Sequence, residues 1–224
     1  MKREGFIQSI STRNFPPSLL RSGLSCGFDI QSTNMHGNVM NTRNLRSDSE
    51  LSILCSEHQL SRRISAPLGG GLFTNSISRF EWHALMASEK TNIKTLLDTC
   101  CRENSDISST SQKWVKRQSI MHTLLDLSQK YQASVESISL RWLLQLNEGS
   151  GDSIIVGSKL GMDLREQNGG LPYNRHKDLR EVLTFALEDD DMDLIGKISG
   201  LSLPAEIPTE IDHKIDFNNK SLWL

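Results

Sequence analysis

One stretch narrows the choice of fold more than any other: Ser61–Phe73, where a short strand pattern runs into three consecutive glycines. Leu60, Ile64 and Ala66 give the apolar alternation of a strand, and Pro67 ends it because proline has no N–H for a sheet ladder. Glycines after a strand let the backbone turn tightly or approach a ligand, as at the binding sites of α/β folds. A plain surface turn is the competing interpretation, so the neighbouring elements decide.

The elements around this stretch alternate between strands and helices. Strands are expected at residues 5–12, 28–32, 60–66 and 152–158, and helices at residues 16–24, 49–57, 119–131, 135–146, 177–187 and 189–199. Strand 152–158 is apolar and β-branched at its centre, which predicts a strand covered on both faces. Strands that alternate with helices predict parallel βαβ units and therefore an α/β fold.

Two segments break this alternation. Residues 74–118 are long, polar and weakly periodic, and the serine-rich part at 105–112 predicts a mobile connection. Residues 203–224 contain two prolines and are expected to form an irregular tail. The chain is therefore expected to form one domain over residues 1–202, with a long polar insertion at 74–118.

Composition excludes several classes of function. The 224 residues carry a formal net charge of −2, which gives no argument for binding nucleic acid or an anionic membrane. Within the sequence no apolar run is long enough to span a bilayer, and no apolar segment of a secretory signal follows the charged start. The four cysteines have no CxxC spacing and the six histidines are scattered, so no metal site is expected. Reduced thiols and a cytoplasmic location are the simplest expectation.

Four blocks of sequence carry a family resemblance. Ser9–Phe15 is similar to a strand ending in Gly-Val-Ser-Asn-Phe, and Phe28–Gln31 to the next strand, which ends in glutamine. Ile64–Leu72 is similar to a strand that runs into Ser-Pro-Leu-Gly-Gly-Gly. Val135–Leu144 followed by Ile154–Lys159 is similar to a helix with Ala-Leu-Arg-Trp and a strand with Ile-Val-Gly-Ala-Arg. In this order the blocks resemble the C-terminal half of the aldo-keto reductase superfamily.

The resemblance implies a partial (β/α)8 TIM barrel of about four βα units, namely the last four strands and the closing helices. It also implies NADP as the cofactor and a small carbonyl compound as the substrate. The family's catalytic Asp, Tyr, Lys and His lie on the first four strands, and no residue of this sequence matches them. The two tyrosines, Tyr131 and Tyr173, are expected in a helix and a loop. We therefore assign no catalytic residue.

Five positions implied by the resemblance concern the nicotinamide and pyrophosphate. Asn14 and Gln31 match residues that hold the nicotinamide carboxamide, and an amide side chain offers both a donor and an acceptor. The alternative for both is capping of a strand end. Gly69, Gly70 and Gly71 match the turn near the pyrophosphate, where backbone N–H groups can cradle phosphate, although an ordinary turn explains them equally well.

Further positions concern the adenosine end of the cofactor. Ser158 and Lys159 match residues that meet the 2′-phosphate, with an exposed loop lysine as the alternative. Glu181 matches a residue that meets adenine, whereas its neighbour Val182 cannot hydrogen-bond. Two other positions depart from the family: Arg13 stands in place of a serine, and Ser65 in place of the aromatic residue that stacks on nicotinamide.

The sequence leaves three hypotheses open. The chain is an NADP(H)-dependent carbonyl/alcohol oxidoreductase whose catalytic half is missing, a non-catalytic nucleotide-binding or interaction module, or a truncated gene product. Four βα units cannot close an eight-stranded barrel, because closure fixes strand number and shear together. Twofold pairing of half-barrels restores closure, so the chain is expected to be either a homodimer or prone to aggregation.

Overall fold

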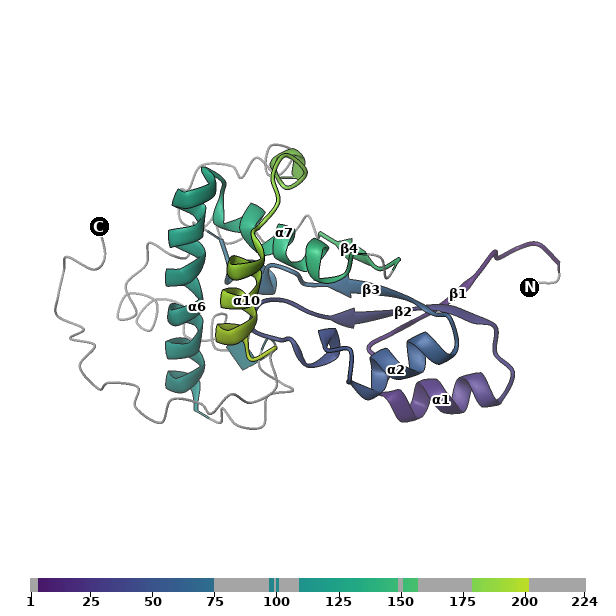
Figure 1. The fold of residues 1–224 in the computed structure, drawn as a ribbon. Helices are drawn as coiled ribbons and strands as arrows, with labels where there is room; N and C mark the ends of the chain where they lie inside the picture. The colour runs from purple at the N-terminus through teal and green to yellow at the C-terminus, as the bar shows by residue number, and fades with distance from the viewer. Residues whose placement is uncertain are drawn as a thin grey trace, which may run out of the picture.

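The centre of the molecule is a sheet of four parallel strands in the order β1-β2-β3-β4 (Figure 1). The structure is a computed structural model that describes residues 4–74, 97–98, 100, 109–148, 151–156 and 179–201. The strands are β1 (Ile10–Arg13), β2 (Ile30–His36), β3 (Ser61–Ser65) and β4 (Ser153–Ile155). Neighbouring strands follow one another along the chain and are linked by helical crossovers. This arrangement confirms an α/β fold and is consistent with part of a TIM barrel.

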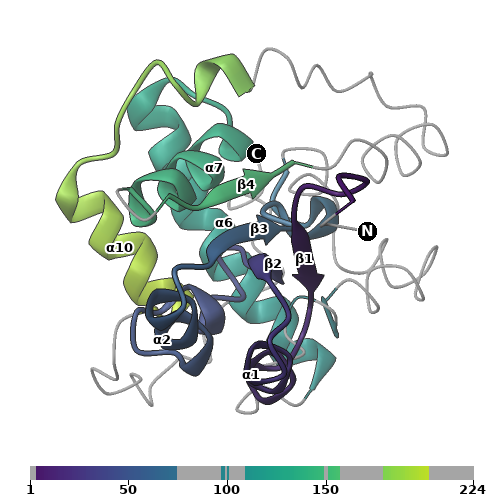
Figure 2. The ribbon, with the colours of Figure 1, turned by 90° about the vertical axis from the view of Figure 1, so that its right-hand side faces the viewer.

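Five described α-helices accompany the sheet. They are α1 (Pro17–Ser25), α2 (Glu50–Glu57), α6 (Thr110–Tyr131), α7 (Val135–Leu146) and α10 (Asp189–Ser199), with short 3-10 turns η1 (Arg43–Leu45) and η2 (Gly69–Gly71). In Figure 2 the helices surround one side of the curved sheet. The helix ends predicted from sequence agree with the structure where a glycine or a serine caps the helix. Gly200, in a left-handed conformation, ends α10, and the Ser134 hydroxyl accepts the Ser137 N–H at the start of α7.

The two faces of the sheet differ in polarity. Thr33, Met35 and Ile64 point toward the helices and are at most 2% exposed. They join a core that includes Leu20, Leu54 and Trp142. The opposite face carries polar residues, because side chains alternate along each strand. Residues paired in register share a face, so Arg13, Asn34 and Arg63 form one row across β1, β2 and β3.

The expected mobile connection is wrong where the structure describes it. Helix α6 begins at Thr110 rather than at residue 119, so residues 110–118 are helical. The Ser109 hydroxyl accepts the Gln112 N–H, and the Gln112 side chain accepts the Ser109 N–H. This reciprocal capping box is a strong helix start, and the serine-rich composition concealed it. The other residues of the expected insertion, apart from Thr74, Leu97, Asp98, Cys100 and Ser109, lie outside the described residues.

Two further expectations fail in the C-terminal part. In the predicted helix at 177–187, only residues 179–181 are helical within the described range, and the Thr184 hydroxyl bonds to the Glu181 carbonyl in a turn. The expectation that strand 152–158 is covered on both faces is also wrong, because Ile155 is 40% exposed. β4 is an edge strand, so no further strand of the described sheet packs beside it. The predicted tail at 203–224 lies outside the described residues.

Each helix in the described part of the chain is too short or too polar to span a membrane.

Candidate functional site

The carboxyl ends of the parallel strands are where α/β barrels place their ligands. Asn14 directly follows β1 at this edge, in a left-handed conformation with φ of 52° that asparagine tolerates. Its N–H donates to the Asn34 carbonyl at 2.8 Å, which fixes the turn against β2. Its side-chain nitrogen donates to Nε2 of His36 at 3.0 Å. This edge of the sheet therefore holds an amide and an imidazole side by side.

His36 is the site residue that sequence reasoning missed. The predicted strand ended at Ser32, whereas β2 continues to His36 and brings that side chain to the carboxyl edge. The register of β2 with β3 pairs His36 with Ser65. Alternation of Thr33 and Met35 on the apolar face was the signal that could have extended the strand.

Gln31 does not join Asn14 at the carboxyl edge. Ile10 and Ser11 pair with Ile30 and Ser32, so Gln31 is the extra residue of a β-bulge near the amino end of β2. Its side chain is exposed. The structure thus separates, by most of the length of β2, the two amides expected to share the nicotinamide carboxamide.

The glycine turn is real, and its conformation needs glycine. Gly69, Gly70 and Gly71 all have positive φ values, of 59°, 68° and 106°. A Cβ on Gly69 would lie 2.8 Å from the Phe73 ring, so that position also needs glycine for space. The Gly69 and Gly71 N–H groups already donate to the carbonyls of Ala66 and Leu68. These two amides are therefore committed within the turn.

Arg117 of α6 anchors the end of this turn. Its Nε and Nη2 donate to the Leu72 carbonyl at 3.0 and 2.7 Å, and its guanidinium lies 5.0 Å from the Trp114 ring centre. The side chain is fully buried, and burial lowers the pKa of Arg117 to about 9. The group therefore stays charged at neutral pH. Ser65 is also committed, since its hydroxyl donates to the Met35 carbonyl at 3.0 Å.

The structure places Glu181 at the start of α7. Its Oε2 accepts the Ser134 N–H at 2.9 Å and the Ser137 hydroxyl at 2.6 Å. A carboxylate at this end satisfies helix N–H groups and complements the helix dipole. Val182 beside it is buried. Ser158 and Lys159 lie outside the described residues.

The described tyrosine, Tyr131, joins two helices. Its hydroxyl donates to Asp191 of α10 and accepts the Glu188 N–H at 2.9 Å. Burial, with the bond to Asp191, raises the pKa of Tyr131. Burial opposes the charge on Asp191, yet hydrogen bonds from Lys130 and Tyr131 outweigh it and lower the pKa of Asp191. This cluster joins the C-terminal end of α6 to the N-terminal end of α10.

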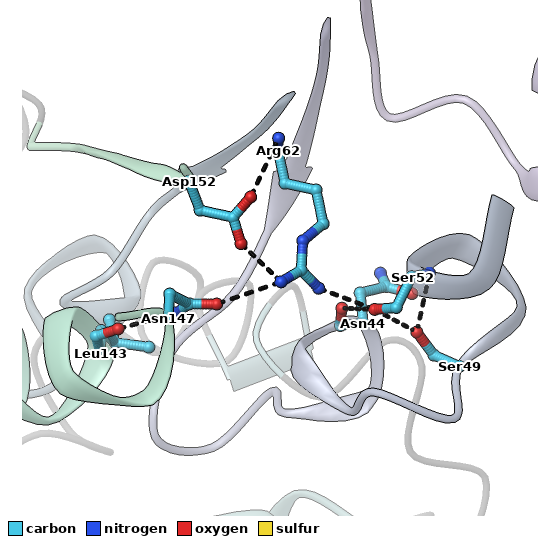
Figure 3. Close-up of polar contacts among 7 residues, drawn as sticks. All are labelled: Asn44, Ser49, Ser52, Arg62, Leu143, Asn147 and Asp152. Atoms are coloured by element: carbon cyan, nitrogen blue, oxygen red, sulfur yellow. Dashed lines mark hydrogen bonds and ion pairs between the residues drawn. The ribbon is translucent and has the colours of Figure 1, made fainter. Parts of the chain in front are cut away.

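The amino ends of β3 and β4 carry a separate polar network (Figure 3). Asp152 forms an ion pair with Arg62 at 2.5 Å and accepts the Arg62 N–H at 3.1 Å. The guanidinium also donates to Ser52 of α2 and to Asn147 at the end of α7. A cavity of about 490 Å³ lies beside Arg62 and Cys55, and burial raises the pKa of that thiol to about 11. Because the cavity lies at the amino ends of the strands, we do not take it as the candidate site.

Within the described ranges, no group of three or more His, Cys, Asp or Glu residues could hold a metal ion.

Comparisons with known proteins agree with the α/β fold described above. The model of the "Aldo/keto reductase family" matches residues 1–195. Because the match starts at residue 1, it does not support the narrower expectation that only the C-terminal half of the family is represented. No curated protein sequence matches the chain.

Solved structures also resemble the chain. The glycerol dehydrogenase AKR11B4 from Gluconobacter oxydans has a TM-score of 0.60 and 15% identity, over 93% of this chain and 54% of its own. The aldo-keto reductase AKR11C1 from Bacillus halodurans, in its holo form, has a TM-score of 0.53 and 12% identity, over 92% of this chain and 55% of its own. The chain thus spans about half the length of these structures, and at such low identity the likeness concerns the fold alone.

Proposed function

The chain belongs to the aldo/keto reductase family, and on that premise we propose that it is part of an NADP(H)-dependent oxidoreductase that interconverts carbonyls and alcohols. The observation that carries the proposal is the Asn14–His36 pair at the carboxyl edge of a parallel sheet. Ligands of α/β barrels bind at this edge, built on the residues that follow the strands. A cytoplasmic location is proposed with it.

The residues at this edge partly fit a nicotinamide dinucleotide. With one N–H of its amide donated to His36, Asn14 keeps a second N–H and its oxygen for the donor and acceptor of a carboxamide. The turn with Gly70 at its centre has no bulky side chain there, so its backbone can approach a bound dinucleotide closely. The poorer fit lies in Ser65, which cannot stack on a ring, and in Gln31, which lies away from the edge.

Each residue has a limited role in this proposal. Bound NADPH supplies the hydride, as nicotinamide cofactors do. Asn14 orients the carboxamide, and His36 holds the Asn14 amide in place. Ser158 and Lys159 contact the 2′-phosphate, the turn Gly69–Gly71 lies near the pyrophosphate, and Glu181 contacts adenine.

We further propose that these four βα units are part of an eight-stranded barrel and that the chain of 224 residues lacks a proton donor. The four-stranded parallel sheet and the half-length likeness to solved structures support this. The role of Tyr131 in joining α6 to α10 supports it as well. That role favours a second candidate function, a non-catalytic module that binds nucleotide or a protein partner.

Nucleotide preference tests the cofactor assignment. We expect calorimetry to show tighter binding of NADP than of NAD, because a lysine contacts the extra phosphate, and Lys159→Ala should abolish the difference. A charge-assisted hydrogen bond contributes roughly 1.5–3 kcal/mol, which is about ten-fold or more in affinity. Lys197→Ala, at an exposed lysine of α10, is the matched control and should change nothing. Equal affinities in the unaltered chain would refute the assignment.

The exposed sheet edges predict association. β1 and β4 are both edge strands, and Phe6, Phe28 and Ile155 are 76%, 61% and 40% exposed. Unpaired edges and apolar side chains favour pairing with a second copy. We expect sedimentation at micromolar concentration to show a homodimer or larger species. A monodisperse species of 25.2 kDa that melts cooperatively would contradict this.

A further inference from the structure

The face of the sheet that points away from the helices carries two arginines in one row. Arg13 pairs with Asn34, and Asn34 pairs with Arg63, so the three side chains project from the same face of neighbouring strands. Both arginines are exposed, and Asn34 lies between them with intermediate burial. The backbones of β1 and β3 are roughly 10 Å apart, which is twice the spacing of neighbouring strands.

The two cations of this row lack a counter-charge in the described ranges. No ion pair joins Arg13 or Arg63, whereas Arg62, on the opposite face, pairs with Asp152 at 2.5 Å. The next rows of the same face contain no acidic residue among the described strands. They consist of Ser11, Ser32 and Ser61 on one side, and His36, Ser65 and Ile155 on the other. The row is therefore a local concentration of positive charge on a chain whose net charge is −2.

Asn34 adds an unused acceptor to this row. Its side-chain oxygen is buried and has no hydrogen-bond partner among the described residues. A buried acceptor left unsatisfied costs free energy, because it has given up its hydrogen bonds to water. A ligand hydroxyl that donates to this oxygen would remove that cost, so the acceptor and the flanking cations together define one ligand chemistry.

We propose that Arg13, Asn34 and Arg63 form a binding site for a small hydroxylated organic anion, with phosphate or carboxylate groups, distinct from the dinucleotide site. Each guanidinium presents a planar fork that matches carboxylate or phosphate oxygens. The Asn34 oxygen accepts the ligand hydroxyl. The site lies on the same sheet as Asn14 and His36, but its binding of an anion does not depend on the proposed oxidoreductase function.

Calorimetry on the full chain tests the site with three probes. Malate and 3-phosphoglycerate each carry a hydroxyl and two anionic groups, and glycerol carries hydroxyls without charge. We expect both anions to bind and glycerol not to bind. Arg13→Gln and Arg63→Gln should each weaken anion binding about ten-fold or more, as expected for loss of a charge-assisted bond. Asn34→Leu should weaken it less, and malate should then lose its advantage over succinate, which lacks the hydroxyl.

The controls separate this site from its alternatives. Arg180→Gln removes another exposed arginine and should leave binding unchanged. Thermal melts of the three arginine variants should agree closely with that of the unaltered chain, because substitutions at exposed positions usually change stability little. Unchanged affinity in the Arg13→Gln/Arg63→Gln double variant would overturn the proposal. So would failure of the unaltered chain to bind either anion, or displacement of the bound anion by NADP, which would assign the row to the dinucleotide. If the unaltered chain binds the anions but does not bind NADP, the cofactor assignment is overturned and the anion site stands.

Discussion

NADPH mixed with the purified 224-residue chain and 4-nitrobenzaldehyde is expected to be oxidised no faster than with heat-inactivated protein. General acid catalysis contributes roughly 10²- to 10⁴-fold to a rate. Among the described residues, no tyrosine lies near Asn14 and His36 to donate a proton. The Tyr131 hydroxyl instead donates a hydrogen bond to Asp191, and the pKa of Tyr131 is raised rather than lowered. The assay follows absorbance of NADPH over hours at several protein concentrations.

A matched variant separates residual chemistry from contamination. Tyr131→Phe should leave the background rate unchanged while lowering the melting temperature, because it removes the bond that joins α6 to α10. Turnover that rises in proportion to protein concentration would show that the chain contains its own proton donor. If Tyr131→Phe then abolished that turnover, the donor would be Tyr131.

Asp152→Ala is expected to be the most destabilising single substitution among the polar residues described above. The Asp152 and Arg62 side chains are only 2% and 13% exposed, so the substitution leaves a buried cation without its partner. Breaking a buried pair in this way costs roughly 3–5 kcal/mol, a large part of a typical stability of about 5–15 kcal/mol. Urea unfolding monitored by circular dichroism measures the change.

Two comparisons test the reason for this loss. The double variant Arg62→Met/Asp152→Leu should recover most of the stability, because it removes both buried charges. Asp48→Ala breaks the Arg46–Asp48 pair, in which the Asp48 side chain is 54% exposed, and should cost much less because solvent screens an exposed pair. Equal losses for Asp152→Ala and Asp48→Ala would show that the buried network contributes nothing special.

The parts of the fold that were predictable from sequence are those set by local signals. Proline and glycine located the ends of β3 and the turn at Gly69–Gly71, and Ser134 and Gly200 marked helix ends. The start of α6 was missed although its capping box is also local, because a serine-rich composition is equally typical of a mobile connection. The exposure of Ile155 was not predictable, since the covering of a sheet face depends on elements that lie far away in the sequence.

The candidate site was less predictable, because it depends on register. Asn14 was found from a motif, but its partner His36 became apparent only when β2 was seen to continue past Ser32. The bulge at Gln31 shifts that residue away from the edge, and a single extra residue leaves no mark in the sequence pattern. The role of Glu181 at α7 likewise follows from contacts between residues more than 40 positions apart.

The long separation between Arg62 and Asp152 has a consequence during synthesis. Asp152 follows Arg62 by 90 residues, and a ribosome adds roughly 5–20 residues per second, so β3 waits roughly 5–18 s for its neighbour. During that interval the nascent chain presents one open edge of β3 and a guanidinium without its carboxylate. Chaperones that shield this edge must act within those seconds, and slower translation of the intervening segment lengthens the exposure.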